Sequence, residues 1–164
     1  MNLLYRIKQF FWGITARVSL EDIEFVKEYL NKDELNLFIK LEVYDQAHCI
    51  RTAKEVKRIY LEKKMSNDFL VKAALLHDIG KVEGKLSLID KSILVILDRL
   101  TKGKIKEFKN FKKIDMYYNH PAKGYNILKK FDYDDRFLYL IRNHHNKSIK
   151  DKELEVLIKC DSMS

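Results

Sequence analysis

The scarcity of turn-forming residues is the strongest constraint on how this chain can fold. Its 164 residues include one proline and five glycines. A β-sandwich or β-barrel needs a turn signal about every 8–12 residues, and the sequence does not supply them. Apolar residues instead recur at helical spacing along most of the chain. We therefore predict an all-α fold with a single hydrophobic core, for which the chain is long enough.

Apolar periodicity and capping signals predict about eight or nine helices, preceded by an extra amphipathic helix at the N-terminus. Ser19 to Asp22 matches a capping box, and Ser66 or Asn67 is expected to cap the most apolar helix, which Gly80 ends. Pro121 is favoured at a first helical position, so two separate helices are expected around it. The predicted helices span residues 1–18, 19–29, 33–41, 43–64, 68–78, 92–100, 112–118, 121–130, 132–143 and 152–161, with an irregular connection at 82–89.

The basic charge balance permits an anionic partner without specifying one. Lys and Arg number 32 against 24 Asp and Glu, a net charge of +8. Nucleotides, nucleic acid and acidic membrane surfaces all fit such a balance. The lysines are scattered over nearly every predicted helix, and no aromatic-basic nucleic-acid motif is present. The charge therefore permits a phosphorylated small molecule as the partner without establishing one, and no specific nucleic-acid recognition is expected.

Cysteine usage and hydropathy predict a cytoplasmic protein. Cys49 and Cys160 are too few for a disulfide framework. No apolar run reaches the roughly 20 residues that a membrane-spanning helix needs. The first 18 residues lack the apolar core and cleavage site of a signal peptide. Their apolar stripe and basic residues permit contact with a membrane surface, although packing against the domain or a partner is the more common role.

The candidate chemistry lies in the histidines and two aspartates. His77 and Asp78 close the most apolar helix, where a carboxylate is costly to bury unless it is paired or bound to a metal. Asp161 lies on the inward side of the last helix. Each residue alone has an ordinary structural explanation, but imidazoles and carboxylates together form the ligand set of Zn²⁺, Fe²⁺ or Mn²⁺. The five histidines are His48, His77, His120, His144 and His145.

Four of these positions carry a resemblance to a known family. The pattern of His48, the pair His77-Asp78 and Asp161 resembles the HD-domain superfamily of metal-dependent phosphohydrolases. The segment YDQAHCIRTAKEV around His48 is similar to the opening helix of that family. HDIGK at 77–81 matches the HDIG and HD-GYP branches.

Two further histidine motifs extend the resemblance. NHPAKGYNIL, which contains His120, and the pair His144-His145 resemble the motifs with which HD proteins hold a dinuclear centre. The resemblance covers about residues 43–161. It implies a single helical-bundle HD domain at 41–164, preceded by a helical extension at 1–40.

The resemblance also implies a division of metal ligands. One metal is expected on His48, His77, Asp78 and Asp161; Asp78 bridges to a second, held by His120 and His144. The ions are two divalent cations, with Fe, Mn, Co and Zn all suitable. Water held between two cations loses a proton near neutral pH and becomes the nucleophile.

Two basic side chains are expected to contact the substrate. Lys81 lies three residues after Asp78, so on a continued helical turn it faces the site and binds the substrate phosphate. The alternative is a lysine that merely stabilises a helix C-terminus. His145 is expected at the substrate phosphate or behind the metal ligands.

Two departures from the family pattern narrow the expected activity. Tyr44 stands where some HD-GYP proteins carry a glutamate for a third metal, so two metals are expected. The GYP motif is absent after His145, which argues against hydrolysis of cyclic di-GMP. The predicted activity is hydrolysis of a phosphate mono- or diester of a nucleotide by a metal-bridging hydroxide. A mixed-valent di-iron oxygenase and a non-catalytic nucleotide-sensing module remain as alternatives.

Overall fold

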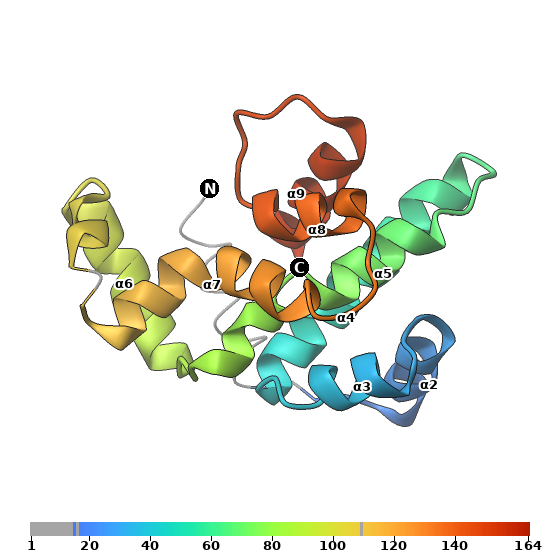
Figure 1. The fold of residues 1–164 in the computed structure, drawn as a ribbon, viewed down its shortest axis with the longest axis horizontal. Coiled ribbons are helices and arrows are strands. Elements are labelled where there is room, and N and C mark those ends of the chain that lie inside the picture. The colour runs from blue at the N-terminus through green and yellow to red at the C-terminus, as the bar shows by residue number, and fades with distance from the viewer. Residues whose placement is uncertain (1–14, 16, 109) are drawn as a thin grey trace.

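The protein is built from helices, as Figure 1 shows for a computed structural model that describes residues 15, 17–108 and 110–164. This described part contains eight α-helices, two short 3-10 helices and no strand, which confirms the predicted all-α class. The predicted N-terminal helix at 1–18 lies almost entirely outside the described residues. The helices are α2 (Leu20–Tyr29), α3 (Lys32–Phe38), α4 (Val43–Glu62), α5 (Asp68–Leu76), η1 (Ile79–Glu83), α6 (Leu88–Leu100), η2 (Lys104–Glu107), α7 (Lys112–Leu128), α8 (Asp135–Asn143) and α9 (Lys152–Met163).

The capping signals place the helix starts. The Ser19 side chain accepts from the backbone N–H of Asp22, whose carboxylate accepts from the Ser19 backbone, so the predicted capping box is present. Asn67 caps α5 by accepting from the backbone N–H of Leu70. Each such cap satisfies backbone donors that the first helical turn leaves without a partner.

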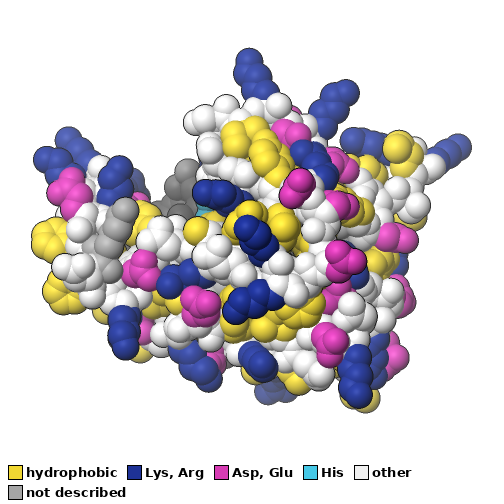
Figure 2. Space-filling view, in the orientation of Figure 1, with side chains coloured by type: hydrophobic (Ala, Val, Ile, Leu, Met, Phe, Trp, Pro, Cys, Tyr) yellow, Lys and Arg dark blue, Asp and Glu magenta, His cyan; other side chains and the backbone are white. Residues whose placement is uncertain are grey.

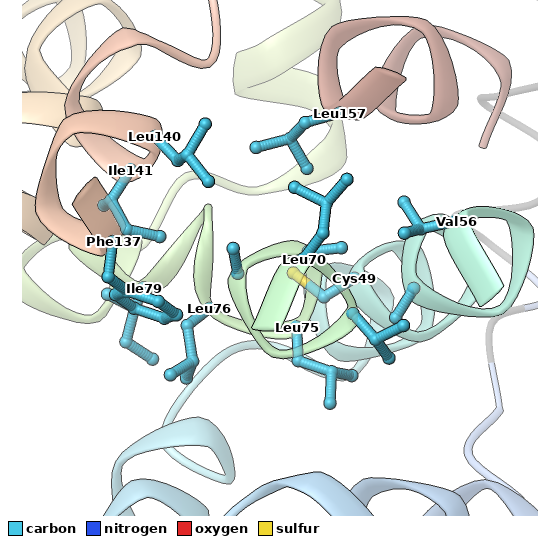
Figure 3. Close-up of a cluster of buried hydrophobic side chains, with 14 of the residues drawn as sticks. Cys49, Val56, Leu70, Leu75, Leu76, Ile79, Phe137, Leu140, Ile141 and Leu157 are labelled. Atoms are coloured by element: carbon cyan, nitrogen blue, oxygen red, sulfur yellow. The ribbon is translucent and has the colours of Figure 1, made fainter. Parts of the chain in front are cut away.

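The main core forms around α5, which packs against α4, α8 and α9. Its apolar side chains are almost completely buried, as the nearly continuous apolar sequence of this helix predicts. Figure 3 shows Leu70 and Leu76 of α5 between Val56 of α4 and Phe137 of α8. Val26 of α2 belongs to the same core. The ends of these helices are therefore held in place by a closely packed core.

The predicted helix boundary at Pro121 is wrong. Pro121 lies inside α7, a single helix, rather than at the start of a second one. A proline at this position leaves the carbonyl of Tyr117 without its usual i→i−4 donor. That carbonyl accepts instead from Nδ1 of His120, at 3.1 Å. The histidine ring thus replaces the missing backbone donor, and the helix continues through the proline.

Several other boundaries differ from the prediction. α3 ends at Phe38 rather than at residue 41, and α8 starts at Asp135 rather than at residue 132. Ser87 forms a capping box with Asp90, so α6 starts at Leu88 rather than at residue 92, within the segment expected to be irregular. Gly80 does not end α5, which stops at Leu76, but lies in η1. A Cβ atom at Gly80 would lie 2.0 Å from the backbone oxygen of His120. Glycine is therefore required because the backbones of η1 and α7 touch.

A second, smaller group of apolar side chains forms where α6 projects from the main body (Figure 1). We call this region the α6 arm: α6, η2 and the first half of α7, residues 86–108 and 110–118. It buries Leu86, Leu94, Ile105 and Met116.

The molecular surface is mixed in charge. Figure 2 shows Lys and Arg side chains distributed over the visible face among Asp and Glu. Among the described residues, no helix combines the length and the apolar character needed to cross a bilayer.

Candidate metal centre

The fold brings all six predicted metal ligands into one cluster. They come from five helices distributed over residues 43–163. Asp78 and His120 are buried, and His77 and His144 are completely buried. The contributions are His48 from α4, His77 and Asp78 from the end of α5, His120 from α7, His144 from the end of α8 and Asp161 from α9.

The first half of the cluster surrounds Oδ2 of Asp78. This oxygen lies 3.5 Å from Nε2 of His77 and 3.8 Å from Nε2 of His48. Oδ1 of Asp161 lies 2.9 Å from Nε2 of His48 and 3.6 Å from Nε2 of His77. The ligand atoms of His48, His77 and Asp78 are close enough together to hold one metal ion.

The second half surrounds the other oxygen of Asp78. Oδ1 lies 3.2 Å from Nε2 of His120 and 3.8 Å from Nε2 of His144. Asp78, His120, His144 and His145 form a second group able to hold a metal ion. One carboxylate therefore faces two groups of imidazoles, with a different oxygen toward each.

Backbone carbonyls set the orientation of three histidine rings. Nδ1 of His77 donates to the carbonyl of Ala74 at 2.8 Å, and Nδ1 of His144 donates to that of Ile141 at 2.7 Å. Nδ1 of His120 lies 3.1 Å from the Tyr117 carbonyl freed by the proline. Because Nδ1 carries the proton in each of these contacts, Nε2 of a neutral ring keeps its lone pair for a metal.

Three buried polar atoms of the cluster lack hydrogen-bond partners among the described residues. They are Nε2 of His77, Nε2 of His144 and Oδ1 of Asp78. Buried polar atoms are nearly always hydrogen-bonded, and an unsatisfied one in a native structure requires an explanation. All three point into the cluster, and all three are atoms that bind divalent metals. The residues therefore fit a metal centre.

The charges of the cluster are strongly coupled. Burial opposes ionisation of Asp78, but Lys81, His77 and His120 hold the pKa of its carboxyl well below the usual value. Burial likewise opposes the charged form of His77, yet the neighbouring Asp78 raises its pKa well above normal. Burial and the adjacent His145 depress the pKa of His144. The carboxylate is thus ionised and His144 neutral, as metal ligands must be, whereas His77 favours its protonated form and would release that proton on binding a metal.

The structure places Lys81 where the sequence predicts it, facing the site. Its Nζ contacts Oδ2 of Asp78 and lies 3.2 Å from Oδ1 of Asp45. Burial opposes its charge, but the carboxylates of Asp45 and Asp78 raise the pKa of Lys81 above its usual value. The lysine therefore stays cationic beside the candidate metal groups.

His145 lies beside the candidate ligand His120. Its Nε2 is 3.0 Å from Nε2 of His120, and its side chain is half exposed. Its predicted contact with substrate stays a prediction, and its ring is also close enough to Asp78, His120 and His144 to share in holding a metal ion.

Tyr44 donates its hydroxyl hydrogen bond to the carbonyl of Leu86.

The structure adds two charged residues beside the site, Asp45 and Lys91, that the sequence motifs do not include. Nζ of Lys91 lies 2.6 Å from Oδ1 of Asp45. Asp45 precedes His48 by three residues and so shares its face of α4, a signal that could have been used. Lys91 comes from α6, whose start was predicted wrongly, and its spacing carries no such signal.

Comparison with known proteins identifies the class. A family model described as the HD domain matches residues 46–163, which is more than half of the chain. The chain therefore belongs to the HD-domain family, whose members are generally metal-dependent phosphohydrolases. The matched region includes both groups of candidate ligands. No curated protein and no solved structure matches the chain.

Proposed function

We propose that this protein hydrolyses a phosphate mono- or diester of a nucleotide with the help of two divalent metal ions. The observation that carries the proposal is the position of Asp78, whose two oxygens face two separate imidazole groups. A structural ion pair would need one partner, whereas a bridge between two cations needs one oxygen directed at each group. Oδ1 faces His120 and His144 with no hydrogen bond of its own, and Oδ2 faces His48 and His77 while it also accepts from Lys81.

The ligands divide between the two halves of the cluster. His48, His77 and Asp161 would hold one ion together with Asp78. His120 and His144 would hold the second with the other oxygen of Asp78, and His145 is close enough to complete that site. Two bound cations supply an activated water near neutral pH and neutralise charge on the phosphoryl oxygens. Fe, Mn, Co and Zn all suit this ligand set.

Lys81 supplies the protein's own cation for the substrate. Its side chain is largely enclosed beside Asp78, so its ammonium group can donate to a phosphoryl oxygen as charge develops there. The water oxygen forms the new bond to phosphorus, the ester P–O bond breaks, and the proton given up by the water goes to the leaving oxygen. The carbonyl contacts of His77, His120 and His144 hold the site in position during this exchange.

Metal analysis and a phosphate-release screen test the proposal. Protein purified without chelator should contain two metal ions per chain, and Asp78→Ala should lower that number. The same variant should turn over more than about 100-fold more slowly than wild type. Removing a hydrogen-bond partner of a metal ligand typically costs about 10–100-fold, and removing the ligand itself should cost more. Asp132→Ala, at an exposed aspartate outside the cluster, is the matched control and should retain both.

Two results would overturn the proposal. One is a protein that binds no metal under any loading condition. The other is a protein loaded with Fe²⁺, Mn²⁺ or Co²⁺ that releases neither phosphate nor mononucleotide from a broad set of nucleotides. Oxygen consumption with a coupled-iron paramagnetic signal, in place of phosphate release, would instead indicate the di-iron oxygenase.

A further inference from the structure

Two lysines from different elements share one buried carboxylate next to the candidate metal centre. Lys81 of η1 and Lys91 of α6 both contact Oδ1 of Asp45, at 3.2 Å and 2.6 Å. Asp45 is 3% exposed, whereas the lysine side chains are 16% and 23% exposed. The carboxylate is therefore enclosed, whereas both lysine side chains reach the solvent in part.

The lysines carry more positive charge than this carboxylate can balance. Lys81 also contacts Asp78, but the proposed function commits that carboxylate to two cations. Asp45 alone then faces two ammonium groups. Burial and the nearby Lys81 outweigh Asp45 and lower the pKa of Lys91 to about 8. A further anion in this place would remove an existing repulsion.

The surroundings hold Lys91 in place rather than neutralise it. Its Nζ lies 4.2 Å from the ring centroid of Tyr44, a contact that favours an ammonium group without supplying a negative charge. The Tyr44 hydroxyl is already engaged with the Leu86 carbonyl. Lys91 thus has a defined position beside Lys81 and hydrogen-bonding capacity left for a ligand.

We propose that Lys91, held beside Lys81 by Asp45, binds a second phosphate group of the substrate next to the one that Lys81 contacts during hydrolysis. This inference rests on the proposed function and narrows its substrate class to phosphate esters that carry an adjacent second phosphate, such as a nucleoside diphosphate cleaved at its ester bond. Lys81 alone would serve a single phosphate at the metals. Lys91 is needed only when a second phosphate extends toward α6. Asp45 acts as a positioning residue because it holds two like charges together.

We call Lys81, Lys91 and Asp45 the lysine clamp. Binding of inorganic pyrophosphate and orthophosphate tests the clamp without requiring turnover. Titration calorimetry would use metal-loaded, full-length protein, with metal content measured after each titration. We expect wild type to bind pyrophosphate at least about 10-fold more tightly than orthophosphate, since one charge-assisted hydrogen bond contributes about 1.5–3 kcal/mol. Lys91→Met should abolish this preference and leave orthophosphate binding within about two-fold. Lys91→Arg should restore part of the preference.

Lys85→Met is the matched control. Lys85 lies in the connection between η1 and α6, and it is exposed and pairs with Glu42. Its replacement removes one positive charge and leaves Lys81, Lys91 and Asp45 intact. If pyrophosphate removes metal from the protein for reasons unrelated to Lys91, Lys85→Met will lose metal as well. Equal weakening of both ligands by Lys91→Met, no weakening of either, or the same loss in Lys85→Met would overturn the inference.

Steady-state kinetics separates this inference from the proposed function. Lys91→Met should lower kcat/KM for a nucleoside diphosphate about 10-fold relative to that for the monophosphate, mainly through KM. Wild type that binds pyrophosphate through Lys91 but hydrolyses nothing would refute the proposed function and leave the clamp standing. Hydrolysis with an unchanged substrate preference in Lys91→Met would refute the clamp alone.

Discussion

The main core and the α6 arm differ sharply in how they are stabilised. In the described residues the main core contains twenty-three buried apolar side chains, whereas the arm contains four. The outer face of α6 stays uncovered: Ile89, Ile93, Ile96 and Leu100 are 49–74% exposed. The arm is therefore packed on one side only.

The candidate chemistry divides along the same line. Every candidate metal ligand comes from a helix that contributes to the main core, with His120 just beyond the arm on α7. Lys91, the proposed contact for a second phosphate, comes from the arm. Metal ligation needs positions held to within about 0.5 Å, and a large core supplies that precision. A substrate contact tolerates a smaller, less stable region.

Two glycines test this comparison most severely. A methyl group at Gly80 would collide with the backbone of α7 at His120 and Gly124, whereas at Gly84 it would meet only the flexible side chain of Met116. Gly80→Ala should therefore lower the free energy of unfolding by more than about 4 kcal/mol and reduce metal content, because it separates Asp78 from His120. Gly84→Ala should cost less than about 1 kcal/mol. Urea denaturation and metal analysis measure both effects.

A loss in Gly80→Ala as small as that in Gly84→Ala would show that η1 and α7 can move apart freely. The large core would then not be what positions the second half of the candidate metal centre.

A pair of leucines tests the same difference through packing. Leu76 is completely buried in the main core and Leu94 is buried in the arm. Leu76→Ala should cost about 4 kcal/mol and Leu94→Ala about 2 kcal/mol, because the half-open arm can relax around the cavity. Only Leu76→Ala should weaken metal binding, since it adjoins His77. A Leu94→Ala protein that loses metal would contradict the division between the two regions.

Much of the fold could be predicted because local signals and burial agree along the chain. The capping box at Ser19 and the apolar run of α5 are sufficient for the helices that they mark. Pro121 failed as a predictor because the donor that compensates for it is a histidine side chain, which no backbone rule anticipates. The start of α6 was placed late because the capping signal at Ser87 was overlooked.

The candidate site could be predicted only where a motif names its residues. His48, His77, Asp78 and Asp161 follow the family pattern, and the structure brings them together. Asp45 and Lys91 form no motif, because their contact joins α4 to α6 across the tertiary structure. The closeness of His145 to His120 also depends on how α7 and α8 pack. Such pairings follow from packing rather than from spacing.

The smallest expected effect is a pH dependence at the junction of the two regions. The pKa of Lys91 falls from 10.5 to about 8 on folding, so between these values the unfolded chain binds more protons at this residue. The contribution of Lys91 to stability therefore rises as pH increases from 8 to 10.5. Wild type should gain stability relative to Lys91→Met over this interval, with Lys85→Met as the reference. Urea denaturation across pH 7–10.5 measures it. If the stability difference between wild type and Lys91→Met does not change with pH, Lys91 is fully solvated in the folded protein and α6 does not bring its charge into the site.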